Sequence, residues 1–145
     1  MAFTIEVANG PVFSSDVPVT GKSVLSESRP DGEEKTIVAW RVNNYLRSLD
    51  WVIEDNARVE FIDTSSFEGM EVYRRSLSFL LVLACKRGLA KDVVLRHSIS
   101  EGYYWEFVEG EVTDEDLAVI KATMAELVGK DLPFIRKVVP LDKAR

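Results

Sequence analysis

The sequence predicts an α+β fold, because strand-like and helix-like patterns occupy different parts of the chain. Before residue 64, apolar residues alternate with polar ones or form short runs rich in β-branched side chains. After residue 71, two long segments repeat their apolar residues with helical spacing. A chain of 145 residues, 46% of them hydrophobic, is long enough to bury one core or two small ones. The change in pattern near residue 64 favours two modules.

The first part of the chain predicts four or five short strands with space for at most one helix. The Asn9-Gly10 and Asn43-Asn44 dipeptides are typical of tight turns between such strands. A polar loop is expected over residues 26–35, where Pro30-Asp31-Gly32 has the composition of a turn. We expect residues 12–13 and 17–19 to return alongside the first strand. The strand candidates are residues 3–7, 12–13, 17–19, 36–42, 45–51 and 57–62.

The second part predicts two helices interleaved with strands. Residues 72–88 are apolar around most of the helix, and Gly88 is expected to end it. Residues 114–128 form the strongest prediction, because Thr113 is a typical N-cap and Asp116 occupies the capping-box position. The strand candidates are residues 93–95, 103–107 and 133–139, the first two separated by the 100–102 turn.

Composition excludes several classes of protein. Lys and Arg total 18 and Asp and Glu total 24, so the net charge of −6 disfavours a general nucleic-acid coat protein. One cysteine and one histidine exclude an intrachain disulfide, a cysteine-rich zinc site and a His₂ or His₃ metal site. No apolar run approaches the ~20 residues of a membrane span, and the N-terminus lacks a basic signal-peptide start. We therefore expect a reduced, cytoplasmic protein that does not contact a membrane.

Two short patterns suggest chemistry, but each has a stronger structural interpretation. Thr20-Gly21-Lys22-Ser23 resembles the end of a phosphate loop, yet Asp16 stands where the first glycine of that motif is required. Cys85 with His97 suggests a nucleophile and its base, but Cys85 falls on the apolar helix, where a free cysteine behaves as a buried hydrophobe. We predict no catalytic and no metal-binding residue in this chain.

The candidate ligand site is a cationic one. Arg74 and Arg75 open the first long helix, and Arg96 and His97 end a strand. Helix N-termini and guanidinium groups both favour anions. Tyr103 and Tyr104 follow nearby, and such rings stack on nucleic-acid bases when they are exposed. We predict that the four cationic side chains converge on a shallow site for a nucleotide or RNA, with a tyrosine beside it; the alternative is solvated arginines and core aromatics.

Residues 1–63 resemble a TGS domain, the small ubiquitin-like β-grasp module at the N-terminus of threonyl-tRNA synthetases. The stretches that carry this resemblance are residues 3–10, 39–43 and 49–61. Residues 72–145 resemble the start of the domain that follows it there, the second additional domain, which edits aminoacyl-tRNA. Ser100-Glu101-Gly102-Tyr103-Tyr104-Trp105-Glu106-Phe107 matches its glycine–aromatic strand, and 113–117 and 130–134 match its helix and the strand after it.

The resemblance departs from the family at the positions that editing requires. In the synthetases the first long helix carries a histidine beside an Arg-x-Ser start, with further ligands four and eight residues on. Arg75, Phe79 and Leu83 occupy these places here. An arginine and two hydrophobes do not bind a metal or position a water for ester hydrolysis, so the resemblance implies that editing is lost.

A second resemblance accounts for that loss. Residues 68–79 and 96–103 resemble the N-terminal region of a bacterial nucleoside kinase family, the uridine kinases. This resemblance implies an N-terminal fragment of a transferase, whose absent C-terminal kinase domain is its partner and binds ATP and magnesium. It divides the chain into a TGS-like module (1–63), a linker (64–71) and a truncated editing-domain-like module (72–145).

Two functions stay open at this point. The first is a non-catalytic accessory region of a nucleoside kinase, without a cofactor of its own. The second is an editing or RNA-binding factor related to threonyl-tRNA synthetase. The residues do not set the oligomeric state.

Overall fold

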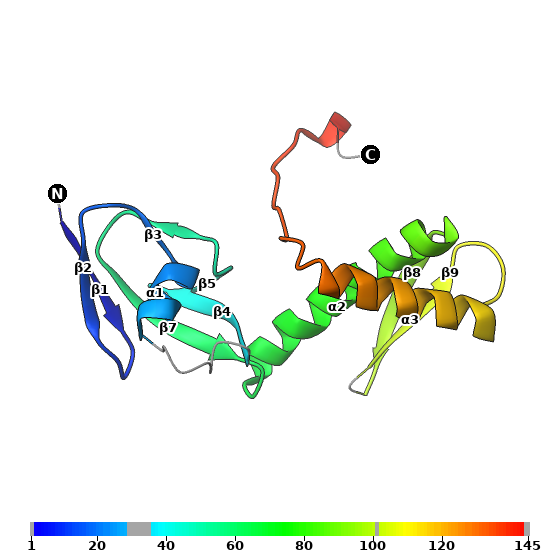
Figure 1. Cartoon of the computed structure of the whole chain (residues 1–145), viewed down its shortest axis with the longest axis horizontal. Coiled ribbons are helices and arrows are strands. Elements are labelled where there is room, and N and C mark those ends of the chain that lie inside the picture. The colour runs from blue at the N-terminus through cyan, green and yellow to red at the C-terminus, as the bar shows by residue number, and fades with distance from the viewer. Residues whose placement is uncertain (1, 29–35, 101, 144–145) are drawn as a thin grey trace. The chain divides into compact units, whose positions relative to one another are not determined.

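The computed structural model describes residues 2–28, 36–100 and 102–143. The chain forms two compact units, Met1–Ser76 and Leu77–Arg145, each with its own hydrophobic core. Figure 1 colours the first unit from blue to green and the second from green to red. Helices and strands both contribute to the structure, so the predicted α+β class is confirmed. The finer module limits, 1–63 and 72–145, stay a prediction; residues 67–71 of the expected linker are helical.

The first unit is built on a mixed five-stranded sheet with the strand order β2-β1-β7-β4-β5. The strands are β1 (Phe3–Val7), β2 (Val12–Ser15), β4 (Ile37–Val42), β5 (Tyr45–Arg47) and β7 (Ala57–Asp63). Neighbours β1 and β7 run parallel, whereas the other pairs are antiparallel. The expected third strand does not join this sheet: β3 (Val19–Thr20) pairs instead with β6 (Val52–Ile53). Only residues 12–15 form the return of the first hairpin.

Asparagines make the turns that the sequence predicted. Asn43 and Asn44 have φ values of 46° and 69°, and they join β4 to β5 in the left-handed conformation that asparagine tolerates best after glycine. Asn9 follows β1 with φ of 56°. The backbone N–H of Asn43 donates to the carbonyl of Arg58 at 2.9 Å, which ties the second turn to β7.

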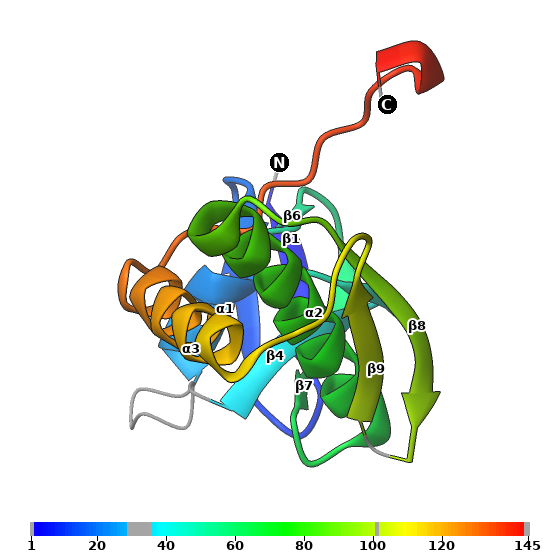
Figure 2. The same ribbon diagram turned by 90° about the vertical axis from the view of Figure 1, so that its right-hand side faces the viewer.

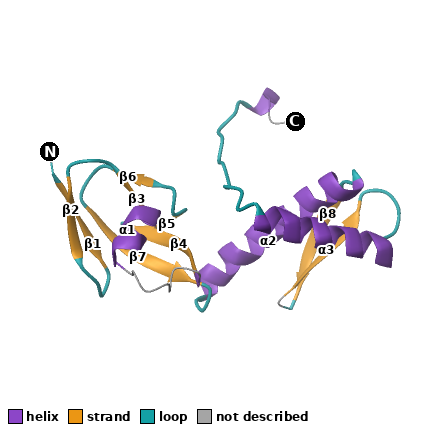
Figure 3. Cartoon of the chain, in the orientation of Figure 1, coloured by secondary structure: helices purple, strands orange, loops and turns teal. Residues whose placement is uncertain are grey.

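A helix occupies part of the segment that was expected to be a loop. Helix α1 (Gly21–Ser28) begins where the Thr20 hydroxyl accepts from the Ser23 backbone N–H at 3.3 Å. A Cβ on Gly21 would lie 2.9 Å from the Trp40 ring, so close packing, not phosphate binding, requires this glycine. Figure 3 shows α1 against one face of the sheet. Residues 29–35 of the expected loop lie outside the described residues.

The core of the first unit lies between α1 and the sheet. Trp40 is fully buried there, and its indole N–H donates to the carbonyl of Ser48 at 2.9 Å. The buried residues of this core are Phe3, Ile5, Val24, Trp40, Val42, Ile53, Ala57 and Val59.

The second unit packs two helices and a hairpin. Figure 2 shows α3 on one side of α2 and the hairpin of β8 and β9 on the other. These elements are α2 (Phe67–Leu89), which belongs to this unit from Leu77 on, β8 (Val93–Ile99), β9 (Gly102–Phe107) and α3 (Asp114–Gly129). Their shared buried core consists of Ala84, Cys85, Phe107, Ile120 and Leu127. None of the helices among the described residues is long and apolar enough to cross a bilayer.

The predicted capping box of α3 is confirmed. The Thr113 hydroxyl accepts from the Asp116 backbone N–H at 3.1 Å, and the Asp116 carboxylate accepts from the Thr113 backbone N–H at 3.1 Å. Lys91 adds a bidentate contact to this carboxylate at 3.0 and 3.1 Å. The Thr113 backbone N–H, followed by Lys91, holds the pKa of Asp116 below its usual value. Asp116 therefore ties the start of α3 to the segment that follows α2.

Gly88 does not end α2 as the sequence suggested. The helix continues to Leu89, and Ala90 after it adopts φ of 54°. A Cβ on Gly88 would lie 2.6 Å from the hydroxyl oxygen of Thr123 and 3.1 Å from a methyl carbon of Val119, both on α3. This glycine is needed for close packing of two helices rather than for a turn.

The last predicted strand is also wrong. Residues 133–139 have no regular secondary structure and lead to a single 3₁₀ turn, Leu141–Lys143. A strand needs a partner for its backbone groups, and within residues 77–100 and 102–143 the strands β8 and β9 pair only with each other. Because none of the described strands pairs with it, this segment stays irregular and exposed despite its strand-like composition.

Candidate functional site

The β8–β9 hairpin brings three of the predicted site residues together. His97 faces Tyr104 in the strand register, and their rings are in contact, tilted by 31° with centroids 5.4 Å apart. Tyr103, the preceding position on β9, pairs with Ser98 and points to the opposite face of the hairpin. Tyr103 is 38% exposed and Tyr104 is 45% exposed, so these rings do not belong to the core. The hairpin therefore presents aromatic surface to solvent, which stacking on a base requires.

Arg96 lies at an irregularity of the same hairpin. Leu95 pairs with Trp105 and His97 with Tyr104, so Arg96 is the extra residue of a β-bulge. Its Nε donates to a carboxylate oxygen of Glu106 at 2.6 Å. The guanidinium charge is thereby compensated, which lowers its value as an anion ligand.

Arg74 and Arg75 face an acidic neighbour of their own. Glu71, one helical turn earlier, lies 3.6 Å from the Arg74 guanidinium and 4.0 Å from that of Arg75. Both arginines belong to the first unit, whereas Arg96 and His97 belong to the second. Their convergence on one anion site stays a prediction.

Cys85 and His97 do not form the nucleophile–base pair that the sequence suggested. Cys85 is fully buried in the core of the second unit, whereas His97 is exposed and contacts the Tyr104 ring. Burial raises the pKa of the Cys85 thiol, and the nearby Asp116 carboxylate raises it further. A buried, protonated thiol is a poor nucleophile.

Across residues 2–28, 36–100 and 102–143, no group of three His, Cys, Asp or Glu side chains is arranged to hold a metal ion.

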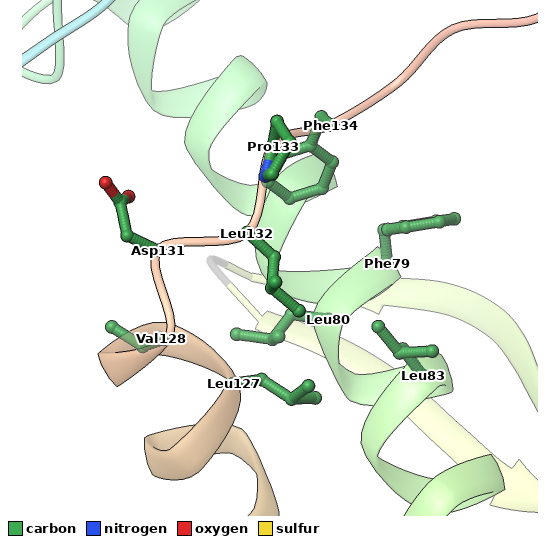
Figure 4. A pocket seen from close by; sticks show the side chains of 9 residues that line it. All are labelled: Phe79, Leu80, Leu83, Leu127, Val128, Asp131, Leu132, Pro133 and Phe134. Atoms are coloured by element: carbon green, nitrogen blue, oxygen red, sulfur yellow. The ribbon is translucent and has the colours of Figure 1, made fainter.

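An apolar cavity of about 250 Å³ occupies the second unit, at positions where the resemblance places editing residues. Figure 4 shows Leu132 directed toward Leu80, while the Asp131 carboxylate points away from both helices. The Phe79 and Phe134 rings meet with centroids 5.6 Å apart. The lining residues are Phe79, Leu80, Leu83, Leu127, Val128, Asp131, Leu132, Pro133 and Phe134.

The side chains that line this cavity suit apolar contacts rather than catalysis. Its single charged lining residue is Asp131, whose carboxylate points away from both helices, and the other lining side chains are apolar (Figure 4). The breadth of the apolar face over residues 72–88 was the signal for it in the sequence. What the sequence did not reveal is that residues 132–134 cover this face as an irregular segment.

Comparison with known proteins gives a consistent relationship. No protein-family model matches the chain. The threonine–tRNA ligase of Azoarcus sp. (strain BH72) is 36% identical over 142 residues, 97% of this chain and 22% of the ligase. The ligase of Methylococcus capsulatus has the same identity and coverage, and that of Rhodospirillum rubrum is 30% identical over 142 residues. The chain thus spans 22% of the length of these curated relatives.

These similarities relate the chain to aminoacyl-tRNA ligases as a class. Within that class the relatives are threonine–tRNA ligases, so the resemblance to threonyl-tRNA synthetases is confirmed at this level. The assignment to the uridine or nucleoside kinases is wrong, because the relatives found over almost the whole chain are ligases. The expectation of ATP, magnesium and a C-terminal kinase domain rested on that assignment and has no other support.

Proposed function

We propose that this chain is a tRNA-contacting accessory region of the threonine–tRNA ligase type, without a catalytic role of its own. The observation that carries the proposal is the 36% identity to a threonine–tRNA ligase over 97% of the chain. A relationship of that extent makes tRNA the first partner to test.

The finer assignment is to two modules. We assign residues 1–63 to a β-grasp, TGS-like module and residues 72–145 to the first part of an editing-domain-like module. The parallel pairing of β1 with β7 and the packing of α1 on the sheet support the first assignment. The capped helix α3 behind the glycine–aromatic strand β9 supports the second.

The editing reaction is not part of the proposal. Phe79 and Leu83 line an apolar cavity, and Arg75 lies beside Glu71. Hydrolysis of an ester needs a positioned water and a base or metal near it. Apolar side chains at these places supply neither.

The surface that we propose for RNA in the second unit is the exposed part of the β8–β9 hairpin. On one face of the hairpin, His97 and Tyr104 are in ring contact and offer ring faces on which unpaired bases stack; Tyr103, the preceding position on β9, offers its ring on the other face. Such stacking is worth roughly 1–3 kcal/mol per base. Because Arg96 is paired with Glu106, we expect the tyrosines to contribute more than this arginine.

The test is titration of a fluorescent threonine tRNA transcript with the full chain, followed by anisotropy. We expect binding that weakens at least about fivefold in Tyr103→Ala/Tyr104→Ala and little in Tyr103→Phe/Tyr104→Phe, which keep the rings. Arg75→Ala/Arg96→Ala tests the cationic site separately. A dissociation constant weaker than roughly 10⁻⁴ M, the weak end of non-specific binding, contradicts the proposal.

A further inference from the structure

An exposed aromatic and cationic group lies in the first unit, outside every site considered so far. The Arg47 guanidinium carbon is 4.5 Å from the centroid of the Trp51 ring and 5.3 Å from that of Tyr45. Tyr45 is 66% exposed and Trp51 is 44% exposed. We call these three residues the Arg47 cluster. Aromatic residues and arginine are the residue types enriched at binding interfaces.

The fold holds the cluster in a defined geometry. Tyr45 and Arg47 are two positions apart on the edge strand β5, so their side chains share one face. The backbone N–H of Trp51 donates to the carbonyl of Ser48 at 2.9 Å, and the buried Trp40 indole donates to the same carbonyl at 2.9 Å. The turn that carries Trp51 is therefore anchored to the core, so its backbone needs little further ordering on binding.

The cluster keeps an uncompensated positive charge. Among the described residues Arg47 makes no ion pair, and its one hydrogen bond is a long contact of 3.4 Å to the carbonyl of Leu46. The nearby acidic residue Asp50 is held by Lys22 at 2.8 Å. The chain has a net charge of −6, but the Arg47 guanidinium makes this part of the surface locally positive, next to two exposed rings.

We infer that the Arg47 cluster binds unpaired nucleotides of RNA. Bases stack on the Tyr45 and Trp51 rings, and the free Arg47 donors hydrogen-bond a phosphate or base edge. Paired nucleotides do not fit, because their base faces are already stacked within a duplex. The choice of RNA rests on the proposed function, but the surface is a separate one, in the first unit.

Nitrogen-15 labelling of the tryptophan indoles provides the test, because the full chain has three tryptophans in different settings. The Trp51 resonance reports the cluster, Trp105 the β8–β9 hairpin, and the buried Trp40 the integrity of the fold. Titration with a ten-nucleotide uridine RNA is expected to shift the Trp51 resonance and leave Trp40 unchanged. A duplex RNA of the same length is expected to shift Trp51 much less.

Substitutions then assign the contacts. We expect Trp51→Ala and Tyr45→Ala each to weaken binding at least about fivefold, and Trp51→Phe to retain most of it. Arg47→Gln lowers the slope of log affinity against log salt by about 0.7, the value for one phosphate contact on a single strand. Phe67→Ala is the matched control, since Phe67 is an 82% exposed aromatic of the first unit outside the cluster.

The outcomes separate this inference from the proposed function. An unmoved Trp51 resonance, an equal response to duplex RNA, or unchanged affinity in Trp51→Ala overturns the inference. A shift of Trp105 alone supports RNA binding by the hairpin and overturns binding by the cluster. A shift of Trp51 alone, with hairpin variants that bind tRNA normally, supports the cluster and contradicts the hairpin surface.

Discussion

Replacing Gly88 with alanine tests the packing of α2 against α3. The added methyl group would lie 2.6 Å from the Thr123 hydroxyl oxygen and 3.1 Å from a methyl carbon of Val119. The Thr123 hydroxyl also donates to the carbonyl of Val119 at 2.9 Å, so moving it away breaks a hydrogen bond. The helices must separate slightly or Thr123 must rotate.

Two opposing effects set the size of the change. Overpacking a close contact costs roughly 1–3 kcal/mol, whereas replacing glycine by alanine inside a helix stabilises by roughly 0.5–1 kcal/mol. The net expectation for Gly88→Ala is a loss of about 1 kcal/mol in the free energy of unfolding. For a unit of this size that loss lowers the melting temperature by roughly 4–8 °C.

Thermal unfolding followed by circular dichroism measures the effect. Gly129→Ala is the control, because a Cβ at Gly129 meets no atom within 4 Å, and its melting temperature should hold or rise. In a Thr123→Ala background the cost of Gly88→Ala should shrink, with a coupling energy of roughly 0.5 kcal/mol or more. If Gly88→Ala is as stable as Gly129→Ala, the helices do not pack as closely as described.

Three further predictions concern the second unit and its chemistry. Because the pKa of Asp116 is lowered, its stabilising effect is present above the ordinary carboxyl pKa and is lost as pH falls through the lowered value. Urea unfolding of Asp116→Asn should therefore show lower stability at pH 7 and a flatter dependence on pH in the acid range. Cys85, fully buried with a raised pKa, should react with Ellman's reagent only after denaturant is added; rapid labelling of the folded chain would contradict its burial. With Arg75, Phe79 and Leu83 at the editing positions, elemental analysis should find no stoichiometric zinc, and mischarged threonine tRNA should stay acylated; one tightly held zinc per chain would show the opposite.

Local signals in the sequence were enough to predict several elements. The cap formed by Thr113 and Asp116 rests on interactions within four residues, and the positive φ values of the Asn43-Asn44 turn suit asparagine itself, although Arg58 also holds Asn43. Such interactions depend little on the rest of the fold, so residue types alone identify them.

Other elements depend on packing that no local signal contains. Helix α1 is rich in serine and begins with glycine, and its stability comes from Val24 and Leu25, which are buried. Residues 133–139 have the composition of a strand, but composition does not supply a hydrogen-bonding neighbour. In the sequence, Gly88 has the appearance of a helix stop. Its role in packing has no local signal, because its partner Thr123 lies 35 positions later in the chain.

The candidate sites show the same division. The pairing of His97 with Tyr104 follows from a hairpin that the sequence predicted, whereas the Glu106 partner of Arg96 depends on a bulge. The Arg47 cluster was missed because a turn brings Trp51 back over a residue four positions earlier.

The parallel pairing of β1 with β7 has a consequence for how the chain is made. Ile5 pairs with Ala57, so the first strand waits for 52 further residues before its parallel neighbour β7 exists. At roughly 5–20 residues per second, synthesis of that stretch takes about 3–10 s. A hairpin forms within microseconds and is only marginally stable alone. For those seconds β1 and β2 leave the ribosome as a hairpin whose Phe3 and Ile5 side chains have no core to enter, and a chaperone that binds nascent apolar segments would meet them there first.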